Sequence, residues 1–224
     1  TASAMTFQIG SQQVAAKRWY VHKTWDQGEV DSPAVEYFLG NDIALVKLQR
    51  PIKSFKPSGF FNRGIEFGAV GISVGYGATG TGTTGATSGI GIKRAGRNRI
   101  DVQDATTRKV LVYDFDQNPH SKGYAGPALD PFTGKISPRP KDYPIRLEYM
   151  IAPGDSGGPI FIGNRVAGVH SFVSGTFDMT SDSSFHDFAY STRVKKWRRW
   201  LKRNIRRINR GNAELNALSL CVSR

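Results

Sequence analysis

The sequence predicts an all-β fold that ends in one amphipathic helix. Short runs of β-branched and aromatic residues recur along most of the 224 residues, and Gly, Pro, Asn and Asp separate them. Because no helical pattern alternates with these runs, an antiparallel barrel or sandwich is favoured over a parallel α/β sheet. Strands are expected at 5–9, 13–21, 43–48, 69–75, 109–113, 159–162 and 165–172.

The helix is expected at 193–210, where apolar residues recur at steps of three and four. The chain before it contains a proline-rich connector at 51–61 and a long surface loop at 117–144, and the segment after it, 211–224, carries no pattern. The apolar stripe of the helix consists of Trp197, Trp200, Leu201, Ile205 and Ile208.

The net charge of +13 is concentrated in this helix. Residues 193–210 hold ten basic side chains and no acidic one, whereas the rest of the chain carries 21 of the 31 basic residues against 18 acidic ones. The body of the protein is therefore almost neutral. Two interpretations stay open for the helix: it docks its tryptophans on the protein and leaves a solvated basic face, or it contacts acidic polymers or surfaces.

Several other classes of protein are disfavoured. No run reaches the ~18 apolar residues of a spanning helix, and the single cysteine, Cys221, excludes an intrachain disulfide. Residues 75–80 fit the dinucleotide fingerprint, but no helix pattern follows them to receive a phosphate. Residues 114–118 resemble the start of a calcium loop, but Pro119 and Ala125 replace its glycine and glutamate. We therefore expect no cofactor and no EF-hand, while a loosely bound cation at 114–118 stays open as an alternative.

Residues 154–159, Gly-Asp-Ser-Gly-Gly-Pro, form the strongest chemical motif. A nucleophilic serine needs a hydroxyl exposed on a sharp turn, with backbone amides directed at the developing oxyanion. Ser156 has this setting, because the glycine at 154 permits a turn that a side chain resists. The amides of Gly154 and Ser156 could then point at one spot. A plain turn between strands is the alternative that composition allows.

Asp42 stands at the entry to the apolar run 43–48. An ionised carboxylate near a core must be paired and hydrogen-bonded. In a Ser-His-Asp system the acid is buried beside an imidazole and fixes its tautomer. A strand-capping aspartate is the alternative.

Together these two segments resemble the chymotrypsin-like serine peptidases, the trypsin (S1) family. Asn-Asp-Ile-Ala-Leu-Val-Lys-Leu at 41–48 is similar to the family's acid-bearing strand, and 154–159 to its nucleophile loop. Further similar segments follow in the family's order at 72–77, 166–172 and 191–194. The resemblance covers roughly residues 5–205, and the Gly- and Thr-rich run from 75 to 91 is most similar to bacterial secreted members.

The resemblance implies two antiparallel β-barrels, the first incomplete, and a C-terminal α-helix. The implied division is 1–60 for the remainder of the N-terminal barrel and a connector, 61–192 for the C-terminal barrel with the nucleophile, 193–210 for the basic helix and 211–224 for a tail.

The family's functional residues map onto this sequence one by one. Ser156 is implied as the nucleophile, Asp42 as the acid that orients a histidine, and the amides of Gly154 and Ser156 as the oxyanion hole. Asp155 is implied as the carboxylate that pairs with a freed N-terminal ammonium in activated members. The implied substrate-binding residues are Met150, His170, Ser171, Phe172 and Val173, of which Ser171 to Val173 run beside the substrate backbone.

This sequence departs from the family's pattern at the catalytic histidine. In the family that histidine belongs to a Thr-Ala-Ala-His-Cys-like segment, which is absent here, and Thr1 to Gly10 resembles the part that follows the segment. His22 is expected to have a surface role, and His120 and His186 are expected to be solvated loop side chains. His170 adjoins the cleft without lying between acid and nucleophile. This polypeptide alone is therefore expected to have at most a trace of activity, and the N-terminal segment of the same protein is expected as its partner.

The sequence indicates the preferred substrate side chain only in part. Met150 occupies the place where trypsins carry an aspartate, so cleavage after Arg or Lys is disfavoured. Val173 favours small or medium apolar side chains, whereas Gly168 to Ser171 resembles the glutamyl endopeptidases, in which a histidine contacts a substrate carboxylate. A core role for His170 is the third interpretation.

The sequence thus predicts a secreted serine endopeptidase that acts on polypeptides through an acyl-enzyme on Ser156 and needs no cofactor; secretion is implied by the family alone. The alternative is an inactive homologue that serves as a binding module through residues 193–210.

Overall fold

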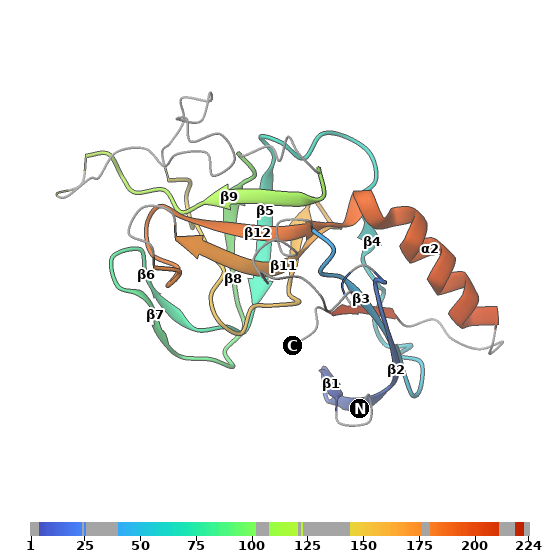
Figure 1. Cartoon of the computed structure of the whole chain (residues 1–224). Coiled ribbons are helices and arrows are strands. Elements are labelled where there is room, and N and C mark those ends of the chain that lie inside the picture. Colours follow the sequence, from blue (N-terminus) through green and yellow to red (C-terminus); the bar gives the residue numbers. More distant parts are fainter. Residues whose placement is uncertain are drawn as a thin grey trace.

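The computed structural model describes residues 5–23, 25, 40–101, 108–120, 122, 144–175, 180–210 and 218–221. Two main β-sheets, a small β-hairpin and one long helix make up this part of the chain (Figure 1). The predicted all-β fold with a helix near the C-terminus is confirmed. No helix among these residues has the length and apolar character needed to cross a membrane.

The smaller sheet is four-stranded and entirely antiparallel. It contains β1 (Thr6–Ile9), β2 (Gln12–Val21), β3 (Ala44–Leu48) and β13 (Leu218–Cys221), in the order β1-β2-β3-β13. All five residues of β3 are buried. Since side chains alternate along a strand, Leu45 packs toward the helix, whereas Val46 and Leu48 pack on the core of the sheet with Val14 and Ile52.

The larger sheet is seven-stranded and holds the nucleophile motif at its centre. It contains β4 (Gly59–Phe60), β5 (Val70–Gly75), β8 (Arg94–Arg99), β9 (Val110–Asp114), β10 (Pro159–Ile162), β11 (Arg165–Gly175) and β12 (Asp187–Arg193). The order is β8-β5-β10-β11-β12-β9, and β4 adds a short parallel pairing to β11. Two further strands, β6 (Thr79–Thr81) and β7 (Gly85–Ser88), form a separate hairpin.

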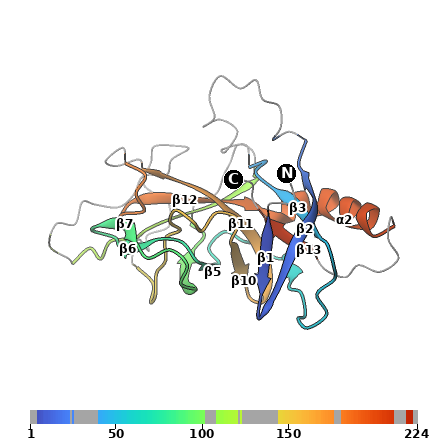
Figure 2. The ribbon, with the colours of Figure 1, turned by 90° about the horizontal axis from the view of Figure 1, so that it is seen from below.

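The helix α2 (Val194–Arg210) follows β12 directly and joins the two sheets. Its buried residues Val194, Leu201 and Ile208 share one apolar cluster with Ile43 of the smaller half and Val169 of the larger half. Figure 2 shows the smaller sheet beside α2 at one end of the molecule, and the β6–β7 hairpin at the opposite end.

A buried ion pair fixes the junction between β12 and α2. Glu66 accepts two bonds from Arg193, at 3.0 and 2.8 Å, and Lys195 lies 3.5 Å from the same carboxylate. Burial acts to raise the pKa of Glu66, but the hydrogen bonds and charge of Arg193 outweigh it, so that the pKa is lowered.

Six strands lie outside the runs from which strands were predicted, namely β4, β6, β7, β8, β12 and β13. β8 is Arg-Ala-Gly-Arg-Asn-Arg, a composition poor in β-formers, and is held by six registered pairs with β5 at the edge of the sheet. The end of β12 was interpreted as the entry to the helix, and β13 lies in the segment that was expected to be a tail. Of the surface loop expected at 117–144, residues 121 and 123–143 lie outside the described residues.

Candidate active site

Ser156 lies at the tip of a tight turn that leads into β10. Gly154 and Gly157 have φ values of +95° and +82°, in the left-handed region that favours glycine. The amide of Gly158 donates to the carbonyl of Asp155 at 2.8 Å and closes the turn. The side chain of Ser156 is exposed, as a nucleophile that meets a substrate must be.

Two amides of this turn are available as donors. In the described part of the chain neither the amide of Gly154 nor that of Ser156 donates a hydrogen bond, whereas the amide of Asp155 between them donates to Ala152 at 2.9 Å. Backbone amides of one turn that have no acceptor within the protein can bind a developing oxyanion.

Asp42 is buried just before β3, next to β11. The hydroxyl of Ser171 donates to its Oδ2 at 2.6 Å, and its Oδ1 is buried with no hydrogen-bond partner among the described residues. Burial raises the pKa of Asp42 to about 6, and the bond from Ser171 opposes this rise only in part. One oxygen of this carboxylate therefore remains available for a donor such as an imidazole N–H.

A β-bulge in β11 brings Ser171 to Asp42. His170 pairs with Ser191 and Phe172 with the next residue, Tyr190, so that Ser171 is the extra residue of the ladder. Bulges redirect a side chain out of the regular alternation, and here the redirected hydroxyl binds the acid.

The backbone of His170 connects the nucleophile turn to the acid. Its carbonyl accepts from Gly157 at 3.0 Å and its amide donates to Gly158 at 2.8 Å, one and two residues after Ser156. Since Ser171 follows His170 and binds Asp42, the two sequence motifs are linked by two short steps across β11. Figure 1 shows β11 crossing the larger sheet toward β3, where the two halves meet.

Comparison with known families identifies the family to which a chain with this arrangement belongs. The family model described as Trypsin matches residues 2–201, which is most of the chain.

The chain belongs to the trypsin family.

A search of solved structures agrees on the fold. Mouse neuropsin, described as a serine protease expressed in the limbic system of mouse brain, has a similar structure with a TM-score of 0.55 and 14% identity. The similarity covers 87% of this chain and 72% of that chain. At this identity it supports the two-barrel fold alone. A search among curated proteins found no match.

The structure describes all four histidines of the chain, His22, His120, His170 and His186. No hydrogen bond joins Asp42 to any of them. The expected surface role of His22 and the expected solvation of His186 are wrong, because both side chains are buried. His22 packs on the rings of Trp197 and Trp200, with ring centroids 4.2 and 5.2 Å away, and Nε2 of His186 lies 3.2 Å from Oε1 of Gln117.

His170 lies inside the second barrel and has no surface exposed to a substrate. Its Nδ1 is 3.0 Å from the hydroxyl of Ser191 and 3.3 Å from that of Tyr113, while Nε2 is buried without a hydrogen-bond partner in the described residues. Burial lowers its pKa to about 4, so the imidazole is neutral at neutral pH. This geometry corresponds to the core role and gives no contact with a substrate carboxylate.

The other expected substrate residues lie close to the nucleophile turn. Phe172 stacks on Tyr190 with ring centroids 4.3 Å apart, and Val173 packs against the core of the larger half. Ser171 to Val173 are half-buried on β11, and Met150 is almost fully buried. The thioether of Met150 is therefore part of the core of the larger half.

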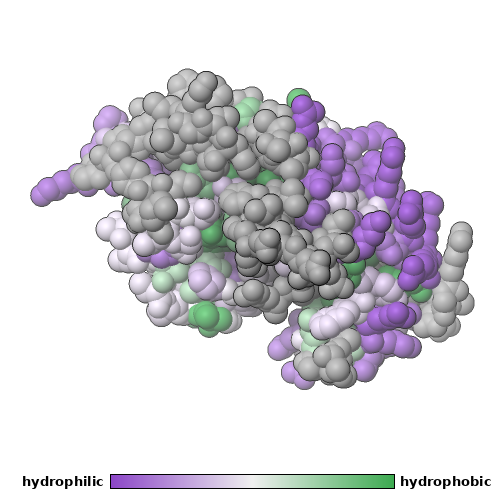
Figure 3. Space-filling view, viewed as in Figure 1, coloured by the Kyte–Doolittle hydropathy of each residue, from purple (hydrophilic) through white to green (hydrophobic). Residues whose placement is uncertain are grey.

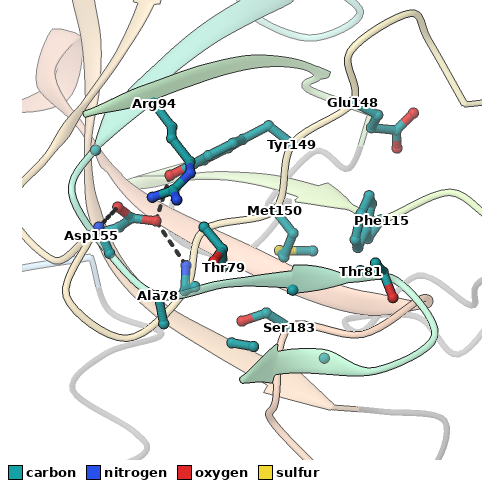
Figure 4. A pocket seen from close by; sticks show the side chains of 16 residues that line it. Ala78, Thr79, Thr81, Arg94, Phe115, Glu148, Tyr149, Met150, Asp155 and Ser183 are labelled. Carbon is teal, nitrogen blue, oxygen red and sulfur yellow. Dashed lines mark hydrogen bonds between the residues drawn. The ribbon is translucent and has the colours of Figure 1, made fainter. Parts of the chain in front are cut away.

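The carboxylate of Asp155 is held by three neutral donors. The amides of Gly77 and Ala152 donate at 2.7 and 3.0 Å, and the Tyr149 hydroxyl makes a short hydrogen bond to Oδ2 (Figure 4). A side chain in place of Gly75 would put its Cβ 1.8 Å from this carboxylate. Among the described residues no cation contacts Asp155, whereas the resemblance implied an ammonium partner.

Tyr149 contacts the carboxylate next to the proposed nucleophile, and this contact was not predicted from the sequence. It carries no motif of its own, and the only hint was the glycine-rich run 75–80, which permits close approach of the backbone to another group. Burial and then the hydrogen bond to Asp155 raise the pKa of Tyr149, so it remains a hydroxyl donor.

A cavity of about 160 Å³ lies beside this carboxylate, between the β6–β7 hairpin and the segment that leads to Ser156. In Figure 4 Tyr149 and Arg94 reach toward Asp155 from one wall, and Met150 and Ser183 lie on the other side. Ser156 does not line it. The cavity therefore lies behind the nucleophile turn and does not hold the reacting bond.

Three carboxylates gather at a different place, near the ends of β8 and β9. Oxygens of Asp101, Asp114 and Asp116 lie within 4.8 Å of one another. Burial, followed by the charge of Asp114, raises the pKa of Asp101 well above its usual range. Shared protons are one way to hold such a cluster, so the three acids do not by themselves establish a metal site.

Proposed function

We propose that this protein is a serine endopeptidase in which Ser156 forms the acyl-enzyme, Asp42 orients the general base, and the amides of Gly154 and Ser156 bind the oxyanion. The observation that carries the proposal is the pair of motifs linked through β11. The turn that exposes the Ser156 hydroxyl is bonded to the backbone of His170, and the next residue, Ser171, binds a buried carboxylate that has one unbound oxygen.

The reaction follows from these groups. The Ser156 oxygen attacks the peptide carbonyl while its proton moves to an imidazole, and the carbonyl oxygen becomes an oxyanion on the two amides. The imidazole then protonates the departing amine, and water attacks the acyl-enzyme by the reverse route. Asp42 stabilises the imidazolium through Oδ1, while Ser171 holds Oδ2.

The base must come from outside the four histidines of this chain, all of which lie elsewhere. We infer that residues 1–224 alone turn over substrate at least about 10⁴-fold more slowly than the same protein supplied with a base. The polypeptide substrate would run beside Ser171 to Val173, with a small or medium apolar side chain directed toward Met150. Because family members usually act outside the cell, that location is part of the proposal.

Chemical rescue tests this assignment. The 224-residue protein is treated with a fluorophosphonate, with and without added imidazole, and the labelled peptide is identified by mass spectrometry. We expect labelling at Ser156 that speeds up with imidazole concentration, because free imidazole can occupy the place between acid and nucleophile. Ser156→Ala should abolish labelling. Asp42→Ala should remove the acceleration but leave slow labelling.

Absence of labelling at Ser156 at every imidazole concentration, in folded protein, would contradict the proposal. That result would favour the second candidate, an inactive homologue that works as a binding module. The observation that favours this candidate is the lack of any imidazole on Asp42 among the described residues.

A further inference from the structure

The outward side of α2 carries a continuous band of positive charge. Seven of its basic side chains are exposed, and the helix contains no acidic residue. Figure 3 shows the hydrophilic side chains gathered over this helix. We call this band the cationic face, and it consists of Lys196, Arg198, Arg199, Lys202, Arg203, Arg206 and Arg207.

No acidic side chain in the part of the chain that the structure describes neutralises the cationic face. The ion pairs of the described residues join Glu66 to Arg193 and Lys195, and none of the seven side chains takes part in one. Each pair of like charges four residues apart, such as Arg199 and Arg203, destabilises a helix by about 0.2–0.5 kcal/mol. The helix persists because its opposite side is buried in the apolar cluster, and the charge remains available to a partner.

The side chains that the cationic face lacks restrict the chemical class of its partner. Trp197 is turned inward, where its indole N–H donates to the carbonyl of Gly40 at 2.8 Å, and Leu201 is fully buried. The large exposed hydrophobic side chains of the described residues all lie outside α2. Insertion into a membrane needs an apolar face and base stacking needs an exposed ring. The exposed side chains of α2 offer neither, and Trp200 is half-buried.

What remains is attraction to closely spaced anions along a linear partner. The seven charges span eleven helical steps, or about 16 Å. Double-stranded nucleic acid presents about ten phosphates over that length, and a single strand about five. Five of the seven side chains are arginines, whose planar guanidinium binds two phosphate oxygens at once.

We propose that the cationic face binds the phosphate backbone of double-stranded nucleic acid without reading its sequence. Five of its side chains, Arg199, Lys202, Arg203, Arg206 and Arg207, line one groove along the helix. This binding does not involve Asp42 or Ser156, so it is independent of whether the proposed peptidase activity is present.

Salt-dependent binding of the 224-residue protein to a fluorescent 20-base-pair duplex tests the proposal. The test variant is Arg199→Gln/Arg203→Gln/Arg206→Gln, and the control is Lys53→Gln/Lys56→Gln/Lys93→Gln, which removes three exposed charges elsewhere. Both variants have the same net charge. Glutamine preserves helix propensity, and circular dichroism establishes that each variant is folded.

We expect the wild-type affinity to fall steeply between 50 and 200 mM salt. Each lost phosphate contact lowers the slope of log affinity against log salt by about 0.9, so the helix variant should lose about 2.7 of that slope. The wild type should thus gain roughly 40-fold more affinity than the helix variant when salt is lowered from 200 to 50 mM. The control variant should keep the wild-type slope.

Equal slopes for the helix and control variants would overturn the proposal, because they would show that net charge and not the helix governs binding. Binding to a sulfated polysaccharide or to anionic vesicles, with none to the duplex, would overturn it as well.

Discussion

Asp42 offers the sharpest test of the site, because its carboxylate is a buried charge without a full set of donors. The perturbation is Asp42→Asn, which keeps the shape of the side chain and the bond from Ser171 but cannot ionise. Burial raises the pKa of Asp42 from 3.8 to about 6. That difference corresponds to roughly 3 kcal/mol of stability lost when the carboxyl ionises in the folded protein.

The sign of the effect follows from the direction of this pKa change. Since the folded-state pKa lies above the unfolded one, the wild type loses stability as pH rises from about 4 through about 6. The variant has no such loss. Asparagine leaves an amide N–H₂ without an acceptor, at a cost of about 1–3 kcal/mol, but this cost is the same at every pH.

The assay is urea unfolding of both proteins at pH 4, 5, 6 and 7, followed by tryptophan fluorescence. Between pH 4 and pH 7 the difference in unfolding free energy should move by roughly 2 kcal/mol in favour of Asp42→Asn. Ser171→Ala should raise the pKa of Asp42 further and steepen the loss in the wild-type background. A difference between Asp42→Asn and the wild type that is constant across pH would refute the reasoning, because it would show that the carboxylate is already paired.

Two further predictions concern the groups around the nucleophile turn. Tyr149→Phe removes a donor to the buried carboxylate of Asp155. The substitution should lower the free energy of unfolding by about 2 kcal/mol and slow the labelling of Ser156. Labelling at the wild-type rate would contradict a positioning role for Tyr149. Burial lowers the pKa of His170 to about 4. As pH falls from 7 to 4, the free energy of unfolding of the wild type should therefore fall by up to about 3 kcal/mol relative to that of His170→Gln. Urea unfolding that shows no such change would mean that the imidazole is solvated.

The residues of the proposed chemistry could be predicted because each lies in a contiguous string. The turn around Ser156 needs its glycines in a fixed order, and Asp42 stands at the head of an apolar strand, so both leave local patterns. The helix was equally predictable, since its apolar stripe repeats with the helical period.

The contacts that complete the site could not be predicted, because they form only in the folded chain. Gly77 donates to Asp155 from a segment 78 residues away, and the glycine-rich run around it gave only a hint of that close approach. Tyr149 lies six residues from Asp155, but its hydroxyl reaches the carboxylate only in the folded turn and carries no motif of its own. The bulge that turns Ser171 toward Asp42 is a property of the pairing between β11 and β12. Edge strand β8 was missed for a similar reason, since pairing with β5 overrides its weak intrinsic preference.

His170 shows how a residue next to the cleft in sequence can be buried in space. Alternation along β11 turns its side chain to the inner face, where it meets Tyr113 and Ser191, so a role in contacting substrate does not follow from position alone.

The donors around Asp155 have a consequence for the nucleophile turn. The carboxylate receives two peptide N–H groups and a phenol from its own chain. Among the described residues, the conformation around Ser156 is therefore stabilised by neutral hydrogen bonds and does not depend on a charged partner of Asp155.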